Sequence, residues 1–292
     1  MAKTRIAIAK PDIVKLFDEH PRKVFDLLGI KRILDENRSF WRLAKRMSYS
    51  DFVNYLLAKT KLKKQVFKFS YRPIVLYVWG DVPLYELLLS LKHNSYLTHY
   101  TALYFHDLTE QTPKTIYINL EQERKPRPKV DLIQERIDFA FSRPTRLSNN
   151  VADYQGLTIR MLNGMHTGNL GVIEMSGPHG ETLRITDVER TLIDITVRPE
   201  YAGGIHEVLK AFRLASNKVS INRLAATLKK IAYTYPYHQA IGFYLEKSGF
   251  YNKSQLDLMK KFETKYDFYL MHQMKDYEYS PRWRLYFPKG LG

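Results

Sequence analysis

Two histidines are the first residues whose type suggests chemistry. The segment LTHYTALYFHDLTEQTPKTIYI, residues 97 to 118, places His99 and His106 seven residues apart on a predicted helix. That spacing separates them by about 10.5 Å along the helix axis. Two histidines on one helix bind a single zinc ion when they are four residues apart. No G-x-S-x-G turn or cysteine nucleophile lies nearby. We therefore predict a structural role for both histidines and no metal site.

The acidic residues Asp187, Glu189 and Asp194 form the densest carboxylate group near predicted strands. A metal-dependent nuclease would need two or three carboxylates that converge on one ion. Glu189 and Asp194 are five residues apart on a predicted helix, which is about 140° around its axis, so they should face different sides. The chain also has no P-loop and no G-x-G-x-x-G motif. We predict a protein without catalytic residues or cofactor, and keep a DNA-associated nuclease as an alternative.

The composition sets outer limits on the kind of protein. The 292 residues are 45% hydrophobic and contain no cysteine, which favours two globular domains and excludes disulfides and cysteine-ligated zinc. No apolar run reaches the length of a membrane span, and the first twenty residues carry too many charges for a signal peptide. We expect a cytoplasmic protein with no membrane partner.

The net charge of +16 is concentrated at the N-terminus. Residues 1 to 80 contain 18 Lys and Arg against 7 Asp and Glu, a net charge of +11, whereas the remainder contains 28 against 23. A local basic excess of this size favours a polyanionic partner, most simply nucleic acid.

The basic segment contains three predicted helices. Pro11 fits the first turn of a helix, and Ile13 and Phe17 follow on one face. A second apolar set predicts another helix that ends near Asn37. Ser48 and Asp51 have the spacing of a capping box, so the sequence FVNYLLAKT after them should be a third helix.

A hairpin follows these helices. The sequence KKQVFKFSYRPIVLYVWG predicts two strands joined by a turn near Pro73. Three helices and a hairpin form the order of a winged helix-turn-helix, whose third helix enters the DNA major groove. The predicted DNA contacts lie before the third helix, on it and along the hairpin: Arg42, Lys45, Arg46, Tyr49, Ser50, Asn54, Lys59, Lys63, Lys64, Lys68, Tyr71 and Arg72. The cations would hold phosphates, and Asn54 could pair with adenine.

The rest of the chain is predicted to contain both strands and helices. Strands are expected near residues 115–119, 157–162, 170–176 and 182–186, with helices from 187 to 264 and two final strands. Thr186 and Glu189 have capping-box spacing, and Gly242 would let another helix approach closely. The predicted fold is α+β, with an N-terminal winged helix-turn-helix at residues 1–80 and a larger mixed α/β C-terminal domain at residues 81–292.

The segments SYLTHYTALYFHDLTEQTPKTIYI, TDVERTLIDITVRPEYAGGIHEVLKAF and AIGFYLEKSGF resemble those of the AbiEi family. These proteins are antitoxins of bacterial AbiE toxin-antitoxin systems of type IV, which contribute to abortive infection as a defence against phage. The resemblance implies a transcriptional repressor that binds inverted repeats in its own promoter through a winged helix-turn-helix. It also implies a C-terminal domain that counters a nucleotidyltransferase-like toxin without a stable complex. A DNA-binding regulator without a toxin partner is the alternative.

A basic surface of the C-terminal domain is the predicted antitoxin site. Within INRLAATLKKIA, an apolar stripe from Ile221 to Ile231 leaves Arg223 and Lys230 on a solvent-facing side about 10.5 Å apart. That spacing suits an extended anion or an acidic protein surface. The predicted residues of this surface are Lys210, Arg213, Lys218, Arg223, Lys229 and Lys230.

Overall fold

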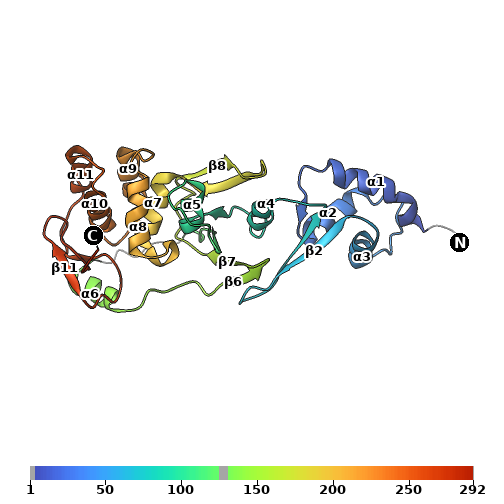
Figure 1. The fold of residues 1–292 in the computed structure, drawn as a ribbon. Helices are drawn as coiled ribbons and strands as arrows, with labels where there is room; N and C mark the ends of the chain where they lie inside the picture. The colour runs from blue at the N-terminus through green and yellow to red at the C-terminus, as the bar shows by residue number, and fades with distance from the viewer. Residues whose placement is uncertain (1–3, 125–130, 292) are drawn as a thin grey trace. The chain divides into compact units, whose positions relative to one another are not determined.

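The computed structural model describes residues 4–124 and 131–291. The chain is an α+β protein, as predicted, with about 40% helix and 18% strand (Figure 1). It divides into two compact units. Unit 1 comprises the chain up to His93 together with Ser176–Leu183, and unit 2 comprises Asn94–Met175 and Arg184–Gly292. In the described part of the chain, no helix combines the length and apolar character that a membrane span requires.

Unit 1 contains four helices and a small antiparallel sheet among its described residues. Its elements, in chain order, are α1 (Arg5–Glu19), β1 (Val24–Phe25), α2 (Leu27–Asn37), α3 (Tyr49–Lys59), β2 (Leu62–Phe67), β3 (Ile74–Trp79) and α4 (Leu84–Leu89). The strand order is β1-β3-β2, with Val24 opposite Val78 and Leu62 opposite Trp79. The predicted α2, α3 and hairpin are confirmed, whereas β1 was not predicted because two residues carry too little periodicity.

The start of α1 differs from the sequence prediction. Pro11 lies inside the helix and not in its first turn. The helix begins six residues earlier because Ile6 and Ala9 are buried in the core of unit 1, and this packing outweighs the preference of proline for a helix start.

Aromatic rings fill the core of unit 1. Phe17 of α1 stacks on Trp79 of β3 with ring centroids 4.6 Å apart, and Trp41 stacks on Phe52 of α3 at 5.8 Å. The indole Nε1 of Trp79 donates a hydrogen bond of 2.6 Å to Asp18. These contacts fix α1 on the sheet and α3 on the loop that follows α2, so that α3 is rigidly supported.

Unit 2 is built on a mixed sheet of six strands in the order β6-β7-β5-β4-β9-β8. The strands are β4 (Tyr96–Leu97), β5 (Thr115–Asn119), β6 (Val151–Tyr154), β7 (Leu157–Leu162), β8 (Val172–Ser176) and β9 (Thr182–Thr186). β5 pairs with β7 and β4 with β9 in parallel, while β4–β5 and β6–β7 are antiparallel. The strands predicted at 115–119, 157–162 and 182–186 are confirmed, and that at 170–176 begins at Val172.

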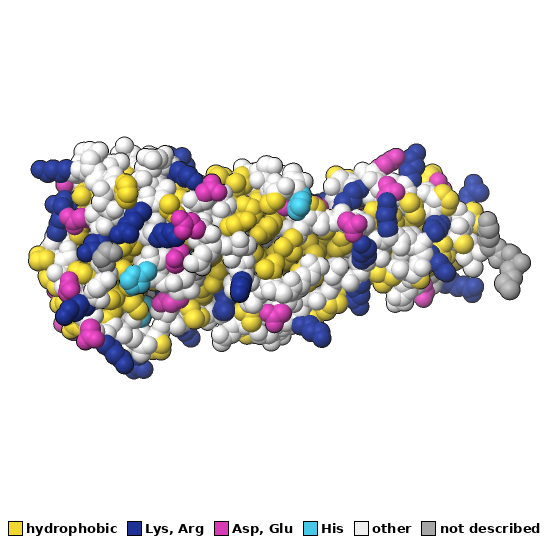
Figure 2. Space-filling view, viewed as in Figure 1, with side chains coloured by type: hydrophobic (Ala, Val, Ile, Leu, Met, Phe, Trp, Pro, Cys, Tyr) yellow, Lys and Arg dark blue, Asp and Glu magenta, His cyan; other side chains and the backbone are white. Residues whose placement is uncertain are grey.

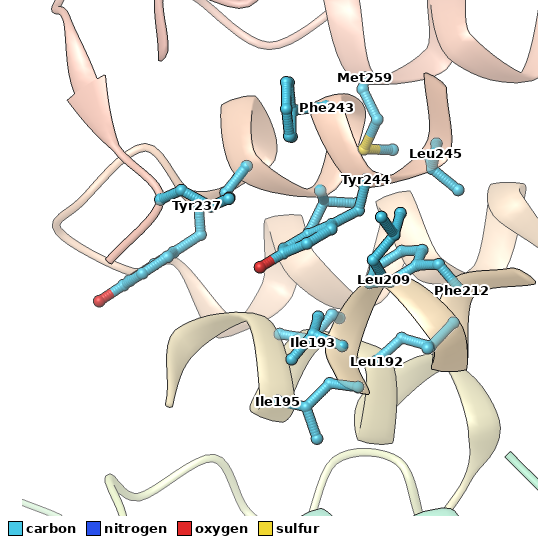
Figure 3. Close-up of a cluster of buried hydrophobic side chains, with 14 of the residues drawn as sticks. Leu192, Ile193, Ile195, Leu209, Phe212, Tyr237, Phe243, Tyr244, Leu245 and Met259 are labelled. Atoms are coloured by element: carbon cyan, nitrogen blue, oxygen red, sulfur yellow. The ribbon is translucent and has the colours of Figure 1, made fainter. Parts of the chain in front are cut away.

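Helices form the second layer of unit 2. They are α5 (His99–Phe105), α6 (Gln134–Ser142), α7 (Val188–Val197), the 3₁₀ turn η1 (Pro199–Ala202), α8 (Ile205–Leu214), α9 (Ile221–Ile231), α10 (Tyr237–Ser248) and α11 (Lys253–Lys260). Figure 3 shows Leu192 and Ile193 of α7 facing Phe212 of α8 and Tyr244 of α10. Phe212 and Tyr244 stack at 5.2 Å. The apolar stripe of α9 is confirmed, because Ile221, Leu224, Leu228 and Ile231 are all buried.

A second small sheet, of order β10-β12-β11, closes unit 2. Its strands are β10 (Phe268–Tyr269), β11 (Tyr277–Ser280) and β12 (Leu285–Pro288). Gln239 of α10 donates to the carbonyls of Tyr266, Trp283 and Arg284, and Glu246 accepts from the indole of Trp283 at 2.5 Å. The element that approaches Gly242 is therefore the Trp283 ring and not a helix, since an added Cβ would lie 2.1 Å from that ring.

The cap of α7 also differs from the prediction. Asp187 is the N-cap, and its carboxylate accepts from the Arg190 amide at 2.7 Å. Thr186 instead bonds the Thr191 hydroxyl at 2.8 Å. Asp187 caps the helix in place of Thr186. The Glu189 side chain, which would complete the capping box of Thr186, instead accepts from the Ser220 amide and pairs with Arg223.

Candidate functional site

The outer face of α3 is short and polar. Its capping box is confirmed: the Ser48 hydroxyl accepts from the Asp51 amide, and the Asp51 carboxylate accepts from the Ser48 amide at 3.2 Å. Phe52, Val53 and Leu56 point into the core. Ser50 and Asn54 are consequently exposed one turn apart, with Asn54 Nδ2 3.5 Å from the Ser50 hydroxyl.

Tyr49 has a different environment from its neighbours on α3. Its hydroxyl donates to both carboxylate oxygens of Asp35 on α2 at 3.2 Å, and Lys31 Nζ lies 4.6 Å from the centre of its ring. Tyr49 is half-buried. Its contacts couple α2 to α3, so this predicted DNA contact is engaged within the protein.

The loop before α3 presents three exposed cations. Arg42, Lys45 and Arg46 are all exposed. Arg38 donates from one guanidinium nitrogen to the carbonyls of Ala44 and Met47, at 3.1 and 3.0 Å, and thereby holds this loop in place. Fixed loop geometry reduces the conformational entropy that binding a polyanion would cost.

The β2–β3 hairpin carries most of the remaining predicted contacts. Leu62 and Phe67 of β2 are buried, whereas Lys63 and Lys64 are exposed. Lys63 forms an ion pair with Asp81 at 2.6 Å, which reduces its availability to a phosphate. Lys68, Tyr71 and Arg72 are exposed in the turn, Tyr71 to 78%. Figure 2 shows Lys and Arg outnumbering acidic side chains on the visible face of unit 1.

Unit 2 contains a buried ion pair at its centre. Arg190 Nε lies 2.7 Å from Asp194, one turn further along α7, and both side chains are less than 10% exposed. The second oxygen of Asp194 accepts from the Thr98 hydroxyl at 3.1 Å. Arg190 also donates to the Leu170 carbonyl at 2.8 Å and to Thr167 at 3.1 Å. The pair thus joins α7 to the start of α5 and to the loop before β8.

Glu121, which follows β5, also binds the loop before β8. It accepts hydrogen bonds from the amides of Thr167 and Asn169 at 2.7 and 3.2 Å, from the Thr167 hydroxyl, and from the Tyr96 hydroxyl. Burial raises the pKa of Glu121, but the bonds from Thr167 outweigh it and bring the pKa below its usual value. Sequence reasoning missed Glu121, because its partners lie up to 48 residues away and no local pattern marks it.

Two more carboxylates of the suspected nuclease group are engaged by α9. Arg223 Nη2 lies 3.0 Å from Asp187 and 3.3 Å from Glu189. Glu189 also accepts from the Ser220 amide at 2.8 Å. Glu189 therefore faces α9 while Asp194 faces α5, as the helical spacing predicted. Across residues 4–124 and 131–291, no group of three or more His, Asp or Glu side chains could hold a metal ion.

The two histidines lie in separate environments. His99 is buried beside Tyr201, with ring centroids 5.2 Å apart, and its Nδ1 lies 3.1 Å from the Thr98 hydroxyl. Burial lowers the pKa of His99 to about 4. His106 Nε2 contacts the Thr186 carbonyl at 2.6 Å. Each histidine is thus part of the packing around α5, α7 and η1.

The six residues predicted as an antitoxin surface divide into two groups. Lys210 pairs with Glu110 at 2.6 Å, Lys218 with Asp107 at 3.2 Å, and Arg223 with Asp187 and Glu189. Arg213, Lys229 and Lys230 are exposed, and none of the three has an ion-pair partner among the described residues. An external anion could bind the second group directly, whereas it would have to displace a carboxylate of the protein from each cation of the first group.

Comparisons with known proteins indicate the fold and no more. The chain matches no family model and no curated protein. A solved structure described as the crystal structure of the RV2827C protein from Mycobacterium tuberculosis is similar over 98% of this chain and 93% of that one, with a TM-score of 0.58 and 13% sequence identity. At this identity the similarity concerns the arrangement of the backbone.

Proposed function

We propose that unit 1 is a winged helix-turn-helix that binds double-stranded DNA. The observation that carries the proposal is the element order α1-β1-α2-α3-β2-β3 with sheet order β1-β3-β2, because this arrangement displays α3 beside a hairpin. α3 would enter the major groove, and the hairpin would contact the backbone or the minor groove.

The distribution of side chains supports this orientation. The centre of α3 presents Ser50 and Asn54, which are short enough to reach base edges, and Asn54 can pair with adenine through two hydrogen bonds. Cations lie at both sides of it, in the loop before α3 and along the hairpin. Phosphate contacts from these cations would set the register of the protein on DNA, while α3 would read the sequence.

We further propose that the whole protein is a cytoplasmic antitoxin of the AbiE type and not an enzyme. In this proposal it represses its own promoter at inverted repeats and counters a nucleotidyltransferase-like toxin through unit 2. The support is the resemblance of three segments, two of which form the α5 and α7–η1–α8 region described above. A DNA-binding regulator without a toxin remains the second candidate.

DNA binding is tested by fluorescence anisotropy of the full chain on a duplex that carries the inverted repeats of its own promoter. If each subunit neutralises about five phosphates, log K should fall with log salt with a slope of about −4.5 per subunit. Lys64→Ala and Arg72→Ala should weaken binding to all sequences alike, and Asn54→Ala should weaken the specific site most. Lys229→Ala in unit 2 is the matched control. Equal effects of Lys229→Ala and Lys64→Ala would contradict the proposal.

The antitoxin activity is tested by growth rescue from the co-expressed product of the neighbouring gene. Charge reversal at Arg213, Lys229 and Lys230 should reduce rescue, because these cations are exposed. Rescue that is unchanged by the reversals would remove this surface from the proposal. A neighbouring gene that does not encode a nucleotidyltransferase-like protein would favour the plain regulator.

A further inference from the structure

The small C-terminal sheet has one apolar face and one tyrosine face. Phe268 of β10 lies opposite Leu285 of β12, and Phe287 lies opposite Glu278 of β11; the three apolar side chains are buried. Side chains alternate between the faces of a strand. The next pairs in register, Tyr269 with Tyr286 and Tyr286 with Tyr279, therefore share the opposite face.

The tyrosine rings form a continuous group across the three strands. Tyr269 stacks on Tyr286 with centroids 5.1 Å apart, and Tyr286 contacts Tyr279 at 4.9 Å and Tyr277 at 5.3 Å. Tyr277 is 54% exposed and Tyr279 is 40% exposed. Single exposed apolar side chains are common on protein surfaces, but four contacting aromatic rings on one sheet face, two of them exposed, form a continuous patch that indicates a binding surface.

The hydroxyl groups of this tyrosine face are oriented by carboxylates. Tyr269 donates to Asp138 at 2.9 Å, and Tyr279 donates to Asp267 at 2.7 Å. Arg284 pairs with Asp267 at 2.9 Å and so compensates its charge. The Tyr269 hydroxyl donates its hydrogen to Asp138, so its oxygen can still accept a hydrogen bond, whereas the Tyr279 oxygen already accepts one from Arg284.

Basic side chains lie at both ends of the β11–β12 ladder. Lys275 and Lys289 flank the end where Tyr277 faces Pro288. At the turn end, where Ser280 faces Leu285, Arg282 pairs with Glu246 and Arg284 pairs with Asp267. Lys275 and Lys289 are exposed. Neither lysine has an ion-pair partner among the described residues, so the two cations complement the phosphates of a short anionic strand that crosses the tyrosines.

We propose that the tyrosine face of the C-terminal sheet binds single-stranded RNA. Exposed aromatic rings on a sheet stack on unpaired bases, and each stacked base contributes without requiring a particular sequence. A duplex does not offer its base faces, so the site is distinct in chemistry from the DNA interface proposed for unit 1. The acceptor oxygen of Tyr269 favours RNA over DNA, because the ribose 2′-hydroxyl is a donor that deoxyribose lacks.

The test is fluorescence anisotropy of the full chain with a labelled 12-nucleotide single-stranded RNA of mixed sequence. The double variant Tyr277→Ala/Tyr279→Ala should bind about tenfold more weakly or worse, since two stacking rings are lost. Tyr277→Phe/Tyr279→Phe keeps the rings and should bind within about twofold of the wild type. Should the alanine pair unfold, Tyr277→Ala alone should still weaken binding by about fivefold, because its ring is more than half exposed.

Three further results separate this site from the DNA interface. Tyr71→Ala, which removes the exposed ring of the β2–β3 turn, should leave RNA binding unchanged, as should Asn54→Ala. A single-stranded DNA of the same sequence should bind more weakly than the RNA. The proposal is overturned if the wild type does not bind the RNA, if the DNA strand binds equally well, or if the alanine variants bind RNA as the wild type does.

Discussion

The polar residues of unit 1 and those of unit 2 that stood out in the sequence have opposite environments. Ser50, Asn54, Lys64 and Arg72 are exposed. In unit 2, Asp187, Glu189, Arg190 and Asp194 are all buried, and each is bonded to another part of the same unit. In the first unit, polarity is directed outwards, where a partner can reach it. In the second, it connects segments of the protein to one another.

This difference shows why charge alone is a weak guide to a binding site. A buried ion pair is expensive to desolvate and is retained only where its geometry and hydrogen bonds compensate. Arg190 meets that condition, because it satisfies Asp194, Thr167 and the Leu170 carbonyl together. The charges of TDVERTLID thus specify how α7, α5 and the loop before β8 fit together.

The largest effect is expected from removing Arg190, which tests whether the buried charges of unit 2 are structural. Arg190→Met leaves Asp194 buried without its cation, and we expect the free energy of unfolding to fall by about 3–5 kcal/mol. The double variant Arg190→Met/Asp194→Leu removes both charges and should recover about half of that loss or more. Urea denaturation followed by circular dichroism measures both. A single variant as stable as the wild type would mean that the pair is not a structural element.

The second largest effect is expected at Gly242. Gly242→Ala places a methyl group 2.1 Å from the Trp283 ring, so α10 and the C-terminal sheet must separate. We expect a loss of about 3 kcal/mol in unfolding free energy, measured by urea denaturation and by the near-ultraviolet circular dichroism of the indole. Combining it with Trp283→Leu should cost less than the sum of the two single changes. Additive losses would show that the ring is not what Gly242 accommodates.

The third effect concerns pH. Burial lowers the pKa of His99 and of His238 to about 4, from 6.5 in an exposed histidine. The unfolded chain therefore takes up these protons first as the pH falls. The stability that comes from keeping these rings neutral is fully present above about pH 6.5 and is lost as the pH falls towards 4; the loss at pH 5.5 is about 1.4 kcal/mol per histidine.

Urea midpoints at pH 7.5 and 5.5 test this dependence. Replacing His99 or His238 by Gln should reduce the difference between the two midpoints. His206→Gln, which changes an exposed histidine of the same unit, should not. Midpoints that are equal at the two pH values would contradict the buried, neutral state of both rings.

How much the sequence predicts depends on how local the cause is. The capping box of Ser48 and Asp51 and the apolar stripe from Ile221 to Ile231 involve neighbours in the chain, and both predictions are confirmed. The predictions of the start of α1, the cap of α7 and the neighbour of Gly242 were wrong. In each case contacts with residues far away in the sequence determine the local structure. Glu121 and the tyrosine face were not predicted, since their partners meet only in the folded chain.

The smallest expected effect separates two kinds of cation on α9. Arg223→Met removes the cation that Asp187 and Glu189 share, and burial already raises the pKa of Asp187. Because the Arg223 side chain is itself 64% exposed, solvent screens its ion pairs, and we expect the unfolding free energy to fall by about 1 kcal/mol or less. Lys229→Met and Lys230→Met, on the same helix, change exposed side chains and should leave the urea midpoint unchanged.

The contrast between these variants decides how the basic surface of unit 2 is to be tested. If Arg223→Met is destabilising, a loss of growth rescue in that variant would report on folding as well as on toxin contact. Loss of rescue in Lys229→Glu/Lys230→Glu, with an unchanged urea midpoint, would report on the surface alone. If Arg223→Met instead unfolds at the wild-type urea concentration, its ion pairs contribute nothing, and Arg223 belongs with Lys229 and Lys230 as a cation available to a partner.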